Sequence, residues 1–334
     1  MSALAAIPLV LLTPVYEDGE ASSRLFRELG AQFGHSARLV VVDDGSVREP
    51  VLAANVAAGG LAGVVLRLRR NVGHQRAIAV GIGYVADHFP GSTVVVLDSD
   101  GEDMPSTVPE LLRALSDPLV DIAVAERKSR VETLRFRLFY LVYKLIFGLM
   151  TGRKIAFGNF MALKPAAVKR LSVMPEVWTH LAGGVLGSRL RIRACQLHRG
   201  PRYAGKSKMN FVGLVLHGFR ALMVFGEDVL VRVGLMSTMI GAGVVLAAIA
   251  AMVLKVIGYA TPGWFSVALG VLFIVLLQTA ALTLTTLMLS GVVKGGSLAI
   301  GAYREFIESI EQVTPDGASA EVAGRVSQDR ASSC

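Results

Sequence analysis

Two long stretches without a charged residue dominate the last third of the sequence. Residues 234–254 give 21 uncharged positions, and residues 264–293 give 30 more. A helix needs about 20 apolar residues to cross a bilayer, so both stretches qualify as membrane spans, and the second is long enough to tilt. The segment 258–263 predicts the turn between them. Two buried helices of a soluble protein are the alternative interpretation.

The distribution of basic residues predicts how these spans are oriented. The formal net charge is +8. Lysines and arginines flank the two stretches on their outer sides, at Lys206, Lys208, Arg220, Arg232, Lys294 and Arg304. The hairpin between the stretches carries only Lys255, so the positive-inside rule predicts both termini on the cytoplasmic side of a bacterial-type inner membrane. Because the basic residues belong to the membrane region, nucleic acid is not an expected partner, while a homo-oligomer formed through the spans is left open.

The first part of the chain alternates short β-branched runs with amphipathic stretches. The predicted strands are residues 8–13, 38–43, 63–68, 93–98 and 121–125. The predicted helices include residues 20–33, 74–88 and 105–115. Continuous apolar strands that alternate with helices predict a parallel α/β sheet covered on both faces. Ligands of such sheets bind at the carboxyl ends of the strands, and two of these strands end in aspartates.

Three segments lie outside this pattern. Residues 132–150 and 209–225 mix large apolar with basic residues, which suits helices in a membrane interface. An ordinary core helix with one solvated face explains residues 132–150 equally well. The sequence after Gln312 is small and polar, which predicts disorder.

An acidic motif, D-S-D-G-E, follows the predicted strand 93–98 and occupies residues 98–102. Its three carboxylates stand at alternate positions, so they can converge on one side of the chain. Carboxylate oxygens suit Mg²⁺ or Mn²⁺, and these ions commonly bridge to substrate phosphates. A solvated acidic turn is the alternative to this candidate metal site.

Two further acidic turns follow neighbouring strands. One is V-D-D-G-S at residues 42–46, and the other is P-V-Y-E-D at residues 14–18. Asp-Gly sequences also form ordinary turns, but the position of these two beside each other favours a ligand pocket. The ring of Tyr16 can stack on a nucleobase there.

Basic residues follow the acidic motifs along the chain. Arg127 and Arg130 come after the last predicted strand, and Arg202, Lys206 and Lys208 lie just before the membrane region. Fixed cations near a diphosphate neutralise a leaving group, and arginine can do so through two hydrogen bonds. Contact with lipid headgroups is the alternative, above all for Lys206.

The sequence G-I-G-Y-V-A at residues 81–86 fits the dinucleotide fingerprint G-x-G-x-x-A. That fingerprint must follow a strand and open a helix. Here it falls inside the predicted helix 74–88, so we do not expect a nicotinamide cofactor.

In this order, the motifs resemble family 2 glycosyltransferases of the dolichyl- and polyprenyl-phosphate mannose or glucose synthase type, including bactoprenol glucosyltransferase-like enzymes. The similarity covers about residues 8–293: P-x-Y, V-D-D-G-S, N-x-G at 71–73, the D-x-D loop and R-x-x-G-x-S-K from Arg202. The resemblance implies a GT-A Rossmann-like nucleotide-sugar-binding domain followed by a two-helix transmembrane hairpin. It also implies inverting, metal-dependent transfer of a hexose from a UDP- or GDP-sugar to a polyprenyl phosphate.

The same resemblance implies roles for individual residues. Those that would hold the nucleotide are Pro14, Tyr16, Asp18, Val42 and Asp44. Those that would line the diphosphate are Asp98, Ser99 and Asp100, and those that would bind Mg²⁺ or Mn²⁺ are Asp100 and Glu102. Those that would contact the diphosphate, the sugar or the lipid phosphate are Arg127, Arg202 and Lys208, which form the implied catalytic set with Asp98 and Asp100.

The resemblance also divides the chain into parts. These are a cytoplasmic GT-A catalytic domain (1–205), a juxtamembrane amphipathic segment (206–230), two transmembrane helices (231–257 and 264–293) and a largely disordered cytoplasmic tail (294–334).

Three positions depart from the family pattern. Asp18 replaces the usual glutamate, and Glu102 stands where glutamine is frequent. Asn159 replaces the aspartate of a G-D-F motif that is often assigned to the acceptor side, which leaves the acceptor open. A processive polysaccharide synthase is an alternative, although Q-x-x-R-W and further spans are missing from the sequence. A non-catalytic membrane module that binds a nucleotide-sugar is another, and the sequence identifies neither the sugar nor its nucleotide.

Overall fold

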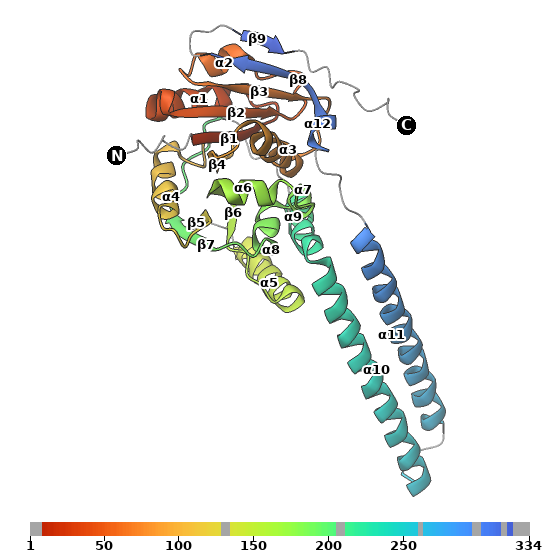
Figure 1. Ribbon diagram of the computed structural model, residues 1–334. Helices are drawn as coiled ribbons and strands as arrows, with labels where there is room; N and C mark the ends of the chain where they lie inside the picture. The colour runs from red at the N-terminus through yellow and green to blue at the C-terminus, as the bar shows by residue number, and fades with distance from the viewer. Residues whose placement is uncertain are drawn as a thin grey trace, which may run out of the picture. The chain divides into compact units, whose positions relative to one another are not determined.

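The structure is a computed structural model that describes residues 9–127, 134–204, 211–259, 263–295, 302–314 and 319–322. The chain forms two compact units, whose elements are labelled in Figure 1. The first unit contains Met1–Leu134, Ile155–Val224 and Leu298–Cys334. The second contains Arg135–Lys154 and Phe225–Ser297.

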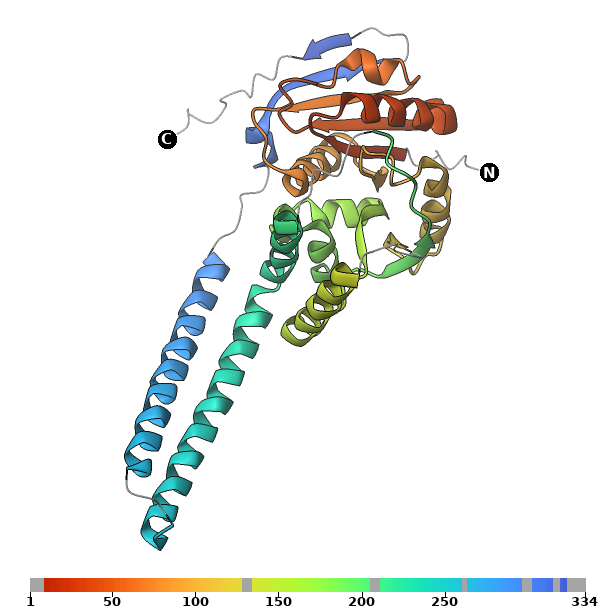
Figure 2. The same cartoon turned by 180° about the vertical axis from the view of Figure 1, so that it is seen from behind.

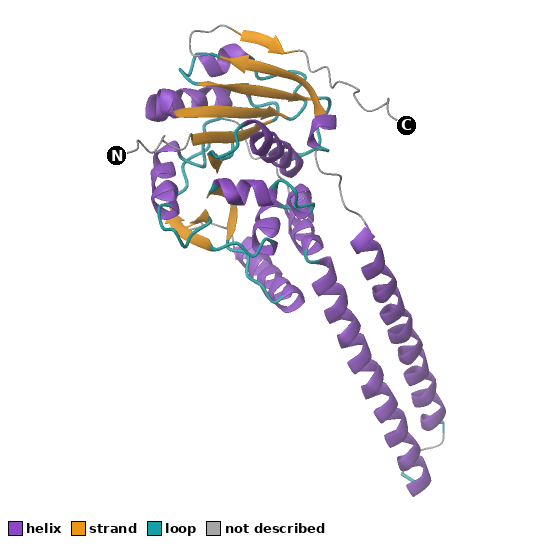
Figure 3. Cartoon of the chain, viewed as in Figure 1, coloured by secondary structure: helices purple, strands orange, loops and turns teal. Residues whose placement is uncertain are grey.

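A single mixed β-sheet forms the centre of the first unit (Figure 3). Its strands are β1 (Leu9–Val15), β2 (Ala37–Asp43), β3 (Ala62–Leu68), β4 (Thr93–Val96), β5 (Ile122–Arg127), β6 (Phe157–Leu163), β7 (Ile192–Leu197), β8 (Ile307–Val313) and β9 (Ser319–Val322). Their order across the sheet is β7-β5-β6-β4-β1-β2-β3-β8-β9. The four central strands β4, β1, β2 and β3 are parallel, so their carboxyl ends meet at one edge.

Helices cover both faces of this sheet. One face packs against α1 (Gly19–Phe33), α2 (Ala53–Ala57) and α4 (Val108–Leu115). The other packs against α3 (His74–His88), α6 (Pro165–Leu171), α7 (Glu176–Thr179) and α8 (Leu181–Gly187), and α9 (Phe211–Val224) contacts α7 and α8. Successive strand residues such as Leu11 and Leu12 enter opposite cores, which explains why the strand sequences are continuously apolar.

The five strands predicted from the sequence are confirmed, each with boundaries within two residues of those observed. The predicted helices 20–33, 74–88 and 105–115 are confirmed as α1, α3 and a short 3₁₀ turn that continues into α4. In the sheet, Val15 pairs with Asp43, and Leu12 pairs with Val96. The loops after β1, β2 and β4 therefore share one edge, where the aspartates were expected.

The expectation of a parallel sheet is confirmed for the five predicted strands but not for the whole sheet. Strand β6 lies between β4 and β5 and is antiparallel to both, with Val95 opposite Ala162. The sequence analysis did not predict β6, so the antiparallel strand between β4 and β5 was not expected. The outcome is a mixed α/β sheet with a parallel centre.

The expectation of a disordered tail is wrong for residues 302–314. Strand β8 pairs antiparallel with β3, and β9 then pairs with β8 (Figure 2). The side chain of Tyr303 is buried and donates a hydrogen bond of 2.7 Å to Asp87 on α3. Arg67 on β3 forms an ion pair of 3.3 Å with Glu311. The physical reason is that β3 would otherwise be an exposed edge, which the returning chain covers.

The dinucleotide-like glycines lie inside α3, as expected from the sequence. A side chain at Gly81 would collide with Leu12, and one at Gly83 would collide with Tyr303. These glycines therefore allow close packing of α3 against β1 and the returning chain.

The second unit consists of α5 (Leu134–Thr151), α10 (Gly226–Ile257) and α11 (Trp264–Gly295). Helices α10 and α11 pack against each other as a hairpin. Arg232 donates a hydrogen bond of 2.9 Å to the carbonyl oxygen of Leu149, and Arg153 pairs with Asp228 at 3.4 Å, so α10 also contacts the end of α5.

Helices α10 and α11 are long and apolar enough to cross a membrane. Only 6% of the most apolar window of α10 and none of that of α11 is buried. A core helix of a soluble protein would be mostly buried, so the soluble alternative does not describe these helices. The predicted two-helix hairpin is confirmed.

Candidate functional site

The acidic loop, defined here as residues 98–103, follows β4 at the shared edge of the sheet. Its own side chains hold its shape: Asp100 accepts a hydrogen bond of 2.9 Å from the amide of Glu102. Asp103 accepts one of 3.0 Å from the amide of Asp98. Gly101 has a φ of +82°, a left-handed conformation that favours glycine. The loop thus gathers four carboxylates within six residues.

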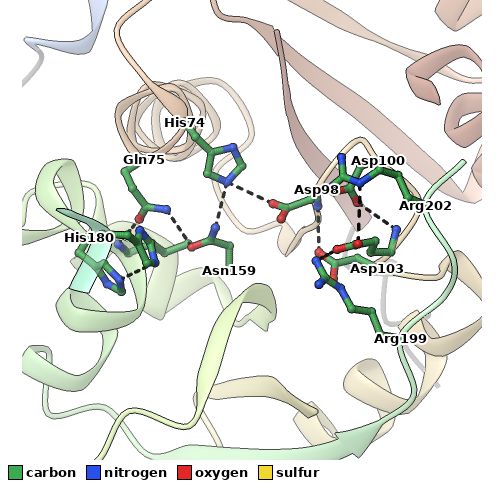
Figure 4. Close-up of polar contacts among 12 residues, drawn as sticks. His74, Gln75, Asp98, Asp100, Asp103, Asn159, His180, Arg199 and Arg202 are labelled. Carbon is green, nitrogen blue, oxygen red and sulfur yellow. Dashed lines mark hydrogen bonds and ion pairs between the residues drawn. The ribbon is translucent and has the colours of Figure 1, made fainter. Parts of the chain in front are cut away.

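The arginine segment, defined here as residues 199–203, lies directly against this loop. Arg202 pairs with Asp100 at 2.7 Å, and Arg199 pairs with Glu102 (Figure 4). The backbones also bond, because the amides of Gly200 and Tyr203 donate to the carbonyl oxygens of Glu102 and Asp100, each at 2.9 Å. The arginine contacts therefore belong to a built interface between two segments of chain.

Aromatic packing fixes the far end of the arginine segment. The ring of Tyr203 fills the space where a side chain at Gly101 would stand. Its hydroxyl donates a hydrogen bond to Glu28 on α1, and burial followed by this contact raises the pKa of Tyr203. The guanidinium of Arg24 lies 4.3 Å from the centre of the same ring. Tyr203 thus anchors the arginine segment to both the loop and α1.

The donors and the charge of the acidic loop fit a divalent cation. Burial raises the pKa of Asp100, and the neighbouring charge of Asp98 raises it further, against the opposing effect of Arg202 and Arg199. The loop carries four carboxylates, and Arg199 and Arg202 pair with two of them, so negative charge remains for a cation. Its oxygen ligands are those that Mg²⁺ and Mn²⁺ prefer. Within the described ranges no three side chains already form a metal cage, since the arginines hold the carboxylates of Asp100 and Glu102.

The aspartates after β2 shape the neighbouring loops. Asp43 accepts hydrogen bonds from the amides of Ser46 at 2.9 Å and Val51 at 3.0 Å. Asp44 accepts from the amides of Val72 at 2.7 Å and Gly73 at 3.0 Å. Burial raises the pKa of Asp44, while the same two amides oppose the rise. Both carboxylates therefore have a loop-forming task that the sequence motif alone does not reveal.

Glu17 folds the loop that follows β1 against the loop that follows β2. Its carboxylate accepts hydrogen bonds from the amides of Val47, Arg48 and Glu49 at 2.8 to 3.1 Å. These contacts, led by the one from Val47, lower the pKa of Glu17. Its own amide donates to the hydroxyl of Ser46 at 2.9 Å. The neighbouring Tyr16 is 42% exposed at the edge of the sheet.

A second polar cluster reaches the acidic loop from the opposite side (Figure 4). His74, the first residue of α3, lies 3.2 Å from Asp98 and 2.9 Å from the amide nitrogen of Asn159 on β6. Gln75 donates a hydrogen bond of 3.1 Å to the Asn159 oxygen and accepts one of 2.6 Å from the amide of Leu181. Burial opposes the charged form of His74, but Asp98 with more distant aspartates raises its pKa. Asp98 thus belongs to both clusters.

Comparison with known sequences gives this arrangement a family. The model described as glycosyl transferase family 2 matches residues 11–166, from β1 to α6.

This chain contains a glycosyl transferase family 2 domain.

Curated relatives are similar to this chain over part of its length. A dodecaprenyl-phosphate galacturonate synthase of Rhizobium johnstonii is 26% identical over 54% of this chain and 55% of its own length. An undecaprenyl-phosphate 4-deoxy-4-formamido-L-arabinose transferase of an Enterobacter species is 28% identical over 61% of this chain and 63% of its own length. The chain therefore spans between about half and two thirds of these relatives.

A solved structure shares the fold of the family 2 domain. It is glucosyl-3-phosphoglycerate synthase from Mycobacterium tuberculosis in complex with Mn²⁺, UDP and glucosyl-3-phosphoglycerate. The TM-score is 0.51 with 16% identity, over 67% of this chain and 81% of that chain. The similarity confirms the expected GT-A fold.

The structure places some of the predicted site residues together and leaves others apart. The structure brings Asp98, Asp100, Glu102 and Arg202 together, with Ser99 in the same loop. Tyr16, Asp18 and Asp44 follow the neighbouring strands, whereas Pro14 and Val42 are buried in β1 and β2. Arg127 ends β5, but its side chain, together with Arg130 and Lys208, lies outside the described residues. All the ligand roles stay predictions.

Sequence reasoning missed five residues of this edge: Arg199, Asp103, Glu17, His74 and Gln75. Arg199 stands three residues before Arg202, and Asp103 extends the acidic motif by one position, so both had a local signal. His74 and Gln75 had none, because their partners Asp98, Asn159 and Leu181 are distant in the sequence.

Proposed function

We propose that this chain transfers a hexose from a UDP- or GDP-linked donor to a polyprenyl phosphate at the cytoplasmic face of a membrane. The observation that carries the proposal is the acidic loop of the family 2 domain paired with the arginine segment, in one chain with two helices of membrane-spanning length. The names of the curated relatives support the acceptor class. The sugar and the acceptor are proposals because the chain matches only part of each relative.

The edge formed by β1, β2 and β4 is the proposed donor site. The nucleotide would be held by Tyr16, Asp18 and Asp44, together with the neighbouring backbone of Pro14 and Val42. Asp44 would do so while its carboxylate keeps the loop-forming hydrogen bonds described above. The acidic loop would line the diphosphate through Asp98, Ser99 and Asp100. This placement follows the rule that ligands of parallel sheets bind beyond the carboxyl ends of the strands.

Asp100 and Glu102 are the residues that would hold Mg²⁺ or Mn²⁺. The bound cation would supply positive charge to the departing diphosphate. Arg199 and Arg202 already lie against this loop, so their guanidinium groups are placed to neutralise phosphate oxygens by paired hydrogen bonds. We assign the same task to Arg127 and Lys208.

A phosphate acceptor explains why an asparagine can stand at position 159. A phosphate monoester has a second pKa of about 6, so it is largely dianionic near pH 7 and needs no general base. Its oxygen attacks the anomeric carbon, the bond from that carbon to the donor diphosphate breaks, and the nucleoside diphosphate leaves with the bonding electron pair. Attack opposite the leaving group inverts the configuration, so an α-linked donor gives a β-linked product.

Lipid transfer by the full-length chain tests this function. The chain would be reconstituted with undecaprenyl phosphate and, in separate reactions, UDP-hexoses, UDP-hexuronic acids and GDP-hexoses. We expect one donor class to give a glycosylated lipid by mass spectrometry, with a β linkage by NMR. An α-linked product or a trapped glycosyl-enzyme would overturn the mechanism. Donor binding without any lipid product would instead favour a non-catalytic module.

The proposed membrane orientation needs a separate test. Cys195 and Cys334 would be replaced by serine, and single Ala260→Cys or Ser332→Cys substitutions would be labelled in intact cells with an impermeant thiol reagent. The distribution of lysine and arginine predicts labelling of the first variant only. Labelling of Ser332→Cys from outside would show that the proposed topology is wrong.

A further inference from the structure

The hydrogen-bond chain beside the acidic loop has a direction fixed by one backbone group. The amide of Leu181 can only donate, so the Gln75 oxygen 2.6 Å away must accept. The NH₂ group of Gln75 therefore faces Asn159 and donates to its oxygen at 3.1 Å. Gln75 is buried, so water cannot readily replace these partners. The orientation of the Asn159 amide follows from that of Gln75.

This orientation turns the NH₂ group of Asn159 toward His74. The Asn159 nitrogen lies 2.9 Å from Nε2 of the imidazole, and a dashed line marks this contact in Figure 4. In the neutral ring, a donor at this distance favours a lone pair on Nε2, because two N–H groups would otherwise face each other. In the neutral ring, the proton then resides on Nδ1.

The contact of the same nitrogen with Asp98 does not change this result. Nε2 of His74 lies 3.2 Å from the Asp98 carboxylate, and it can donate there only when it carries a proton. Beside a carboxylate, the protonated form that gains most is the imidazolium, in which Nδ1 is protonated as well. The neutral Nε2–H tautomer and the imidazolium both lose the Asn159 contact, but only the imidazolium adds an ion pair to its hydrogen bond with Asp98. Both favoured forms therefore carry a proton on Nδ1.

Nδ1 of His74 has no partner within the part of the chain that the structure describes, and the side chain is 44% exposed. His74 begins the 15-residue helix α3, whose amino terminus favours a nearby anion. We propose that His74 donates a hydrogen bond from Nδ1 to a phosphate oxygen of a substrate, and that Leu181, Gln75 and Asn159 fix it as a donor. The inference rests on the proposed function and excludes a general-base role for Nδ1.

Two substitutions of His74 distinguish the contribution of Nδ1 from that of Nε2. The amide NH₂ of asparagine takes approximately the place of Nδ1, whereas that of glutamine takes the place of Nε2. We expect His74→Gln to weaken phosphate binding about 10- to 100-fold, the effect of losing a hydrogen bond to a charged group. His74→Asn should stay within about threefold of the native chain. The exposed His35, changed in the same two ways, is the matched control and should show no effect.

The phosphate can belong to the donor diphosphate or to the acceptor, and two binding experiments distinguish these sources. One measures the affinity of the full-length chain in detergent for UDP and GDP, and the other its affinity for undecaprenyl phosphate. If His74→Gln lowers the affinity in one of these experiments while His74→Asn does not, the result supports the proposal and identifies the phosphate. Neither measurement depends on turnover, so a failure of sugar transfer leaves this test intact.

The remaining outcomes overturn the proposal. If His74→Asn loses affinity and His74→Gln keeps it, the residue acts through Nε2 on Asp98. Equal losses would show that the ring itself is required, and no loss in either variant would show that His74 contacts no phosphate.

Reversing the direction of the hydrogen bonds between Gln75, Asn159 and His74 tests whether that direction matters. In Gln75→Glu, the new carboxylate can only accept, so Asn159 should turn its NH₂ group toward position 75 and its oxygen toward His74. The proton of the neutral imidazole would then move to Nε2. We expect a fall in phosphate affinity comparable to that of His74→Gln, and ¹⁵N NMR of labelled histidine should report the changed tautomer. A changed tautomer with unchanged affinity would contradict the proposal.

Discussion

The two polar clusters that meet at Asp98 use opposite kinds of interaction. On one side, the carboxylates of the acidic loop pair with Arg199 and Arg202, and charge alone largely decides these contacts. On the other side, Gln75 and Asn159 are neutral amides, and the direction of each hydrogen bond decides the contacts. A carboxylate can exchange one cation for another, whereas an amide chain works in one direction only. The first cluster is suited to binding and release, and the second to holding one arrangement.

Removing a carboxylate from the charged cluster should have the largest effect. We expect Asp100→Ala to lower transfer at least about 1,000-fold, because it removes a proposed cation ligand and the partner of Arg202 together. Glu102→Gln keeps an oxygen at the proposed cation site, so the transfer rate should fall about tenfold or less. Transfer rates and the Mn²⁺ affinity measured by electron paramagnetic resonance would show both effects. Full activity of the native chain in excess chelator would contradict a metal role.

Removing an arginine should separate catalysis from metal binding. Arg202 lies 2.7 Å from Asp100, so it competes with any cation for that carboxylate. We expect Arg202→Gln to strengthen Mn²⁺ binding while it lowers kcat about 100-fold, which corresponds to about 3 kcal/mol at a leaving group. Arg191→Gln is the matched control, because it breaks an equally short pair with Asp121 away from the site. Weaker Mn²⁺ binding in Arg202→Gln would show that the arginine supports the cation.

The sequence predicted where the strands lie more readily than which strands pair. Strands β1 and β2 are runs of consecutive apolar residues, and burial on both faces is visible in such a run. Strand β8 reads I-E-S-I-E-Q-V, in which only the last residue, Val313, is buried, and its partner β3 is about 240 residues earlier. Nothing local to β8 indicates that partner, so the segment before Gln312 was predicted as part of a disordered tail.

The same distinction applies to the site. Asp98 and Asp100 were found because an acidic motif after a strand is a local pattern. The arginine segment was found in part, through Arg202, because its charge suggested a phosphate. His74 and Gln75 were missed because their importance depends on a backbone amide at Leu181, and the direction of hydrogen bonds leaves no trace in composition.

The free energy of unfolding should fall in mild acid because of a buried histidine on the neutral side of the site. His180, 4% exposed, accepts a hydrogen bond of 3.0 Å at Nδ1 from the amide of Gly183 and so caps α8. Burial, followed by His217, lowers its pKa to about 3, well below its usual 6.5. The unfolded chain therefore binds a proton that the folded chain excludes, and stability present above pH 6.5 is lost as the pH falls toward 3.

The expected loss is about 2 kcal/mol between pH 6.5 and pH 5, at about 1.4 kcal/mol per pH unit. Thermal unfolding of the detergent-solubilised chain across this range would measure it. His180→Asn keeps a capping oxygen but cannot titrate, so its stability should depend less on pH by about this amount. If the stability of the native chain and that of His180→Asn depend on pH in the same way, His180 is not the group responsible.

The smallest effect should come from restoring a carboxylate at position 159. In Asn159→Asp, one oxygen can still accept from Gln75, and the other can accept from Nε2 of His74. With two carboxylates beside it, the ring is held as an imidazolium, so the proton on Nδ1 is retained. We therefore expect the transfer rate to change less than tenfold. Asn159→Leu removes both partners and should behave more like His74→Gln. A loss in Asn159→Asp as large as that in Asn159→Leu would mean that His74 must be neutral to act, and that the amide at this position cannot be replaced by a charge.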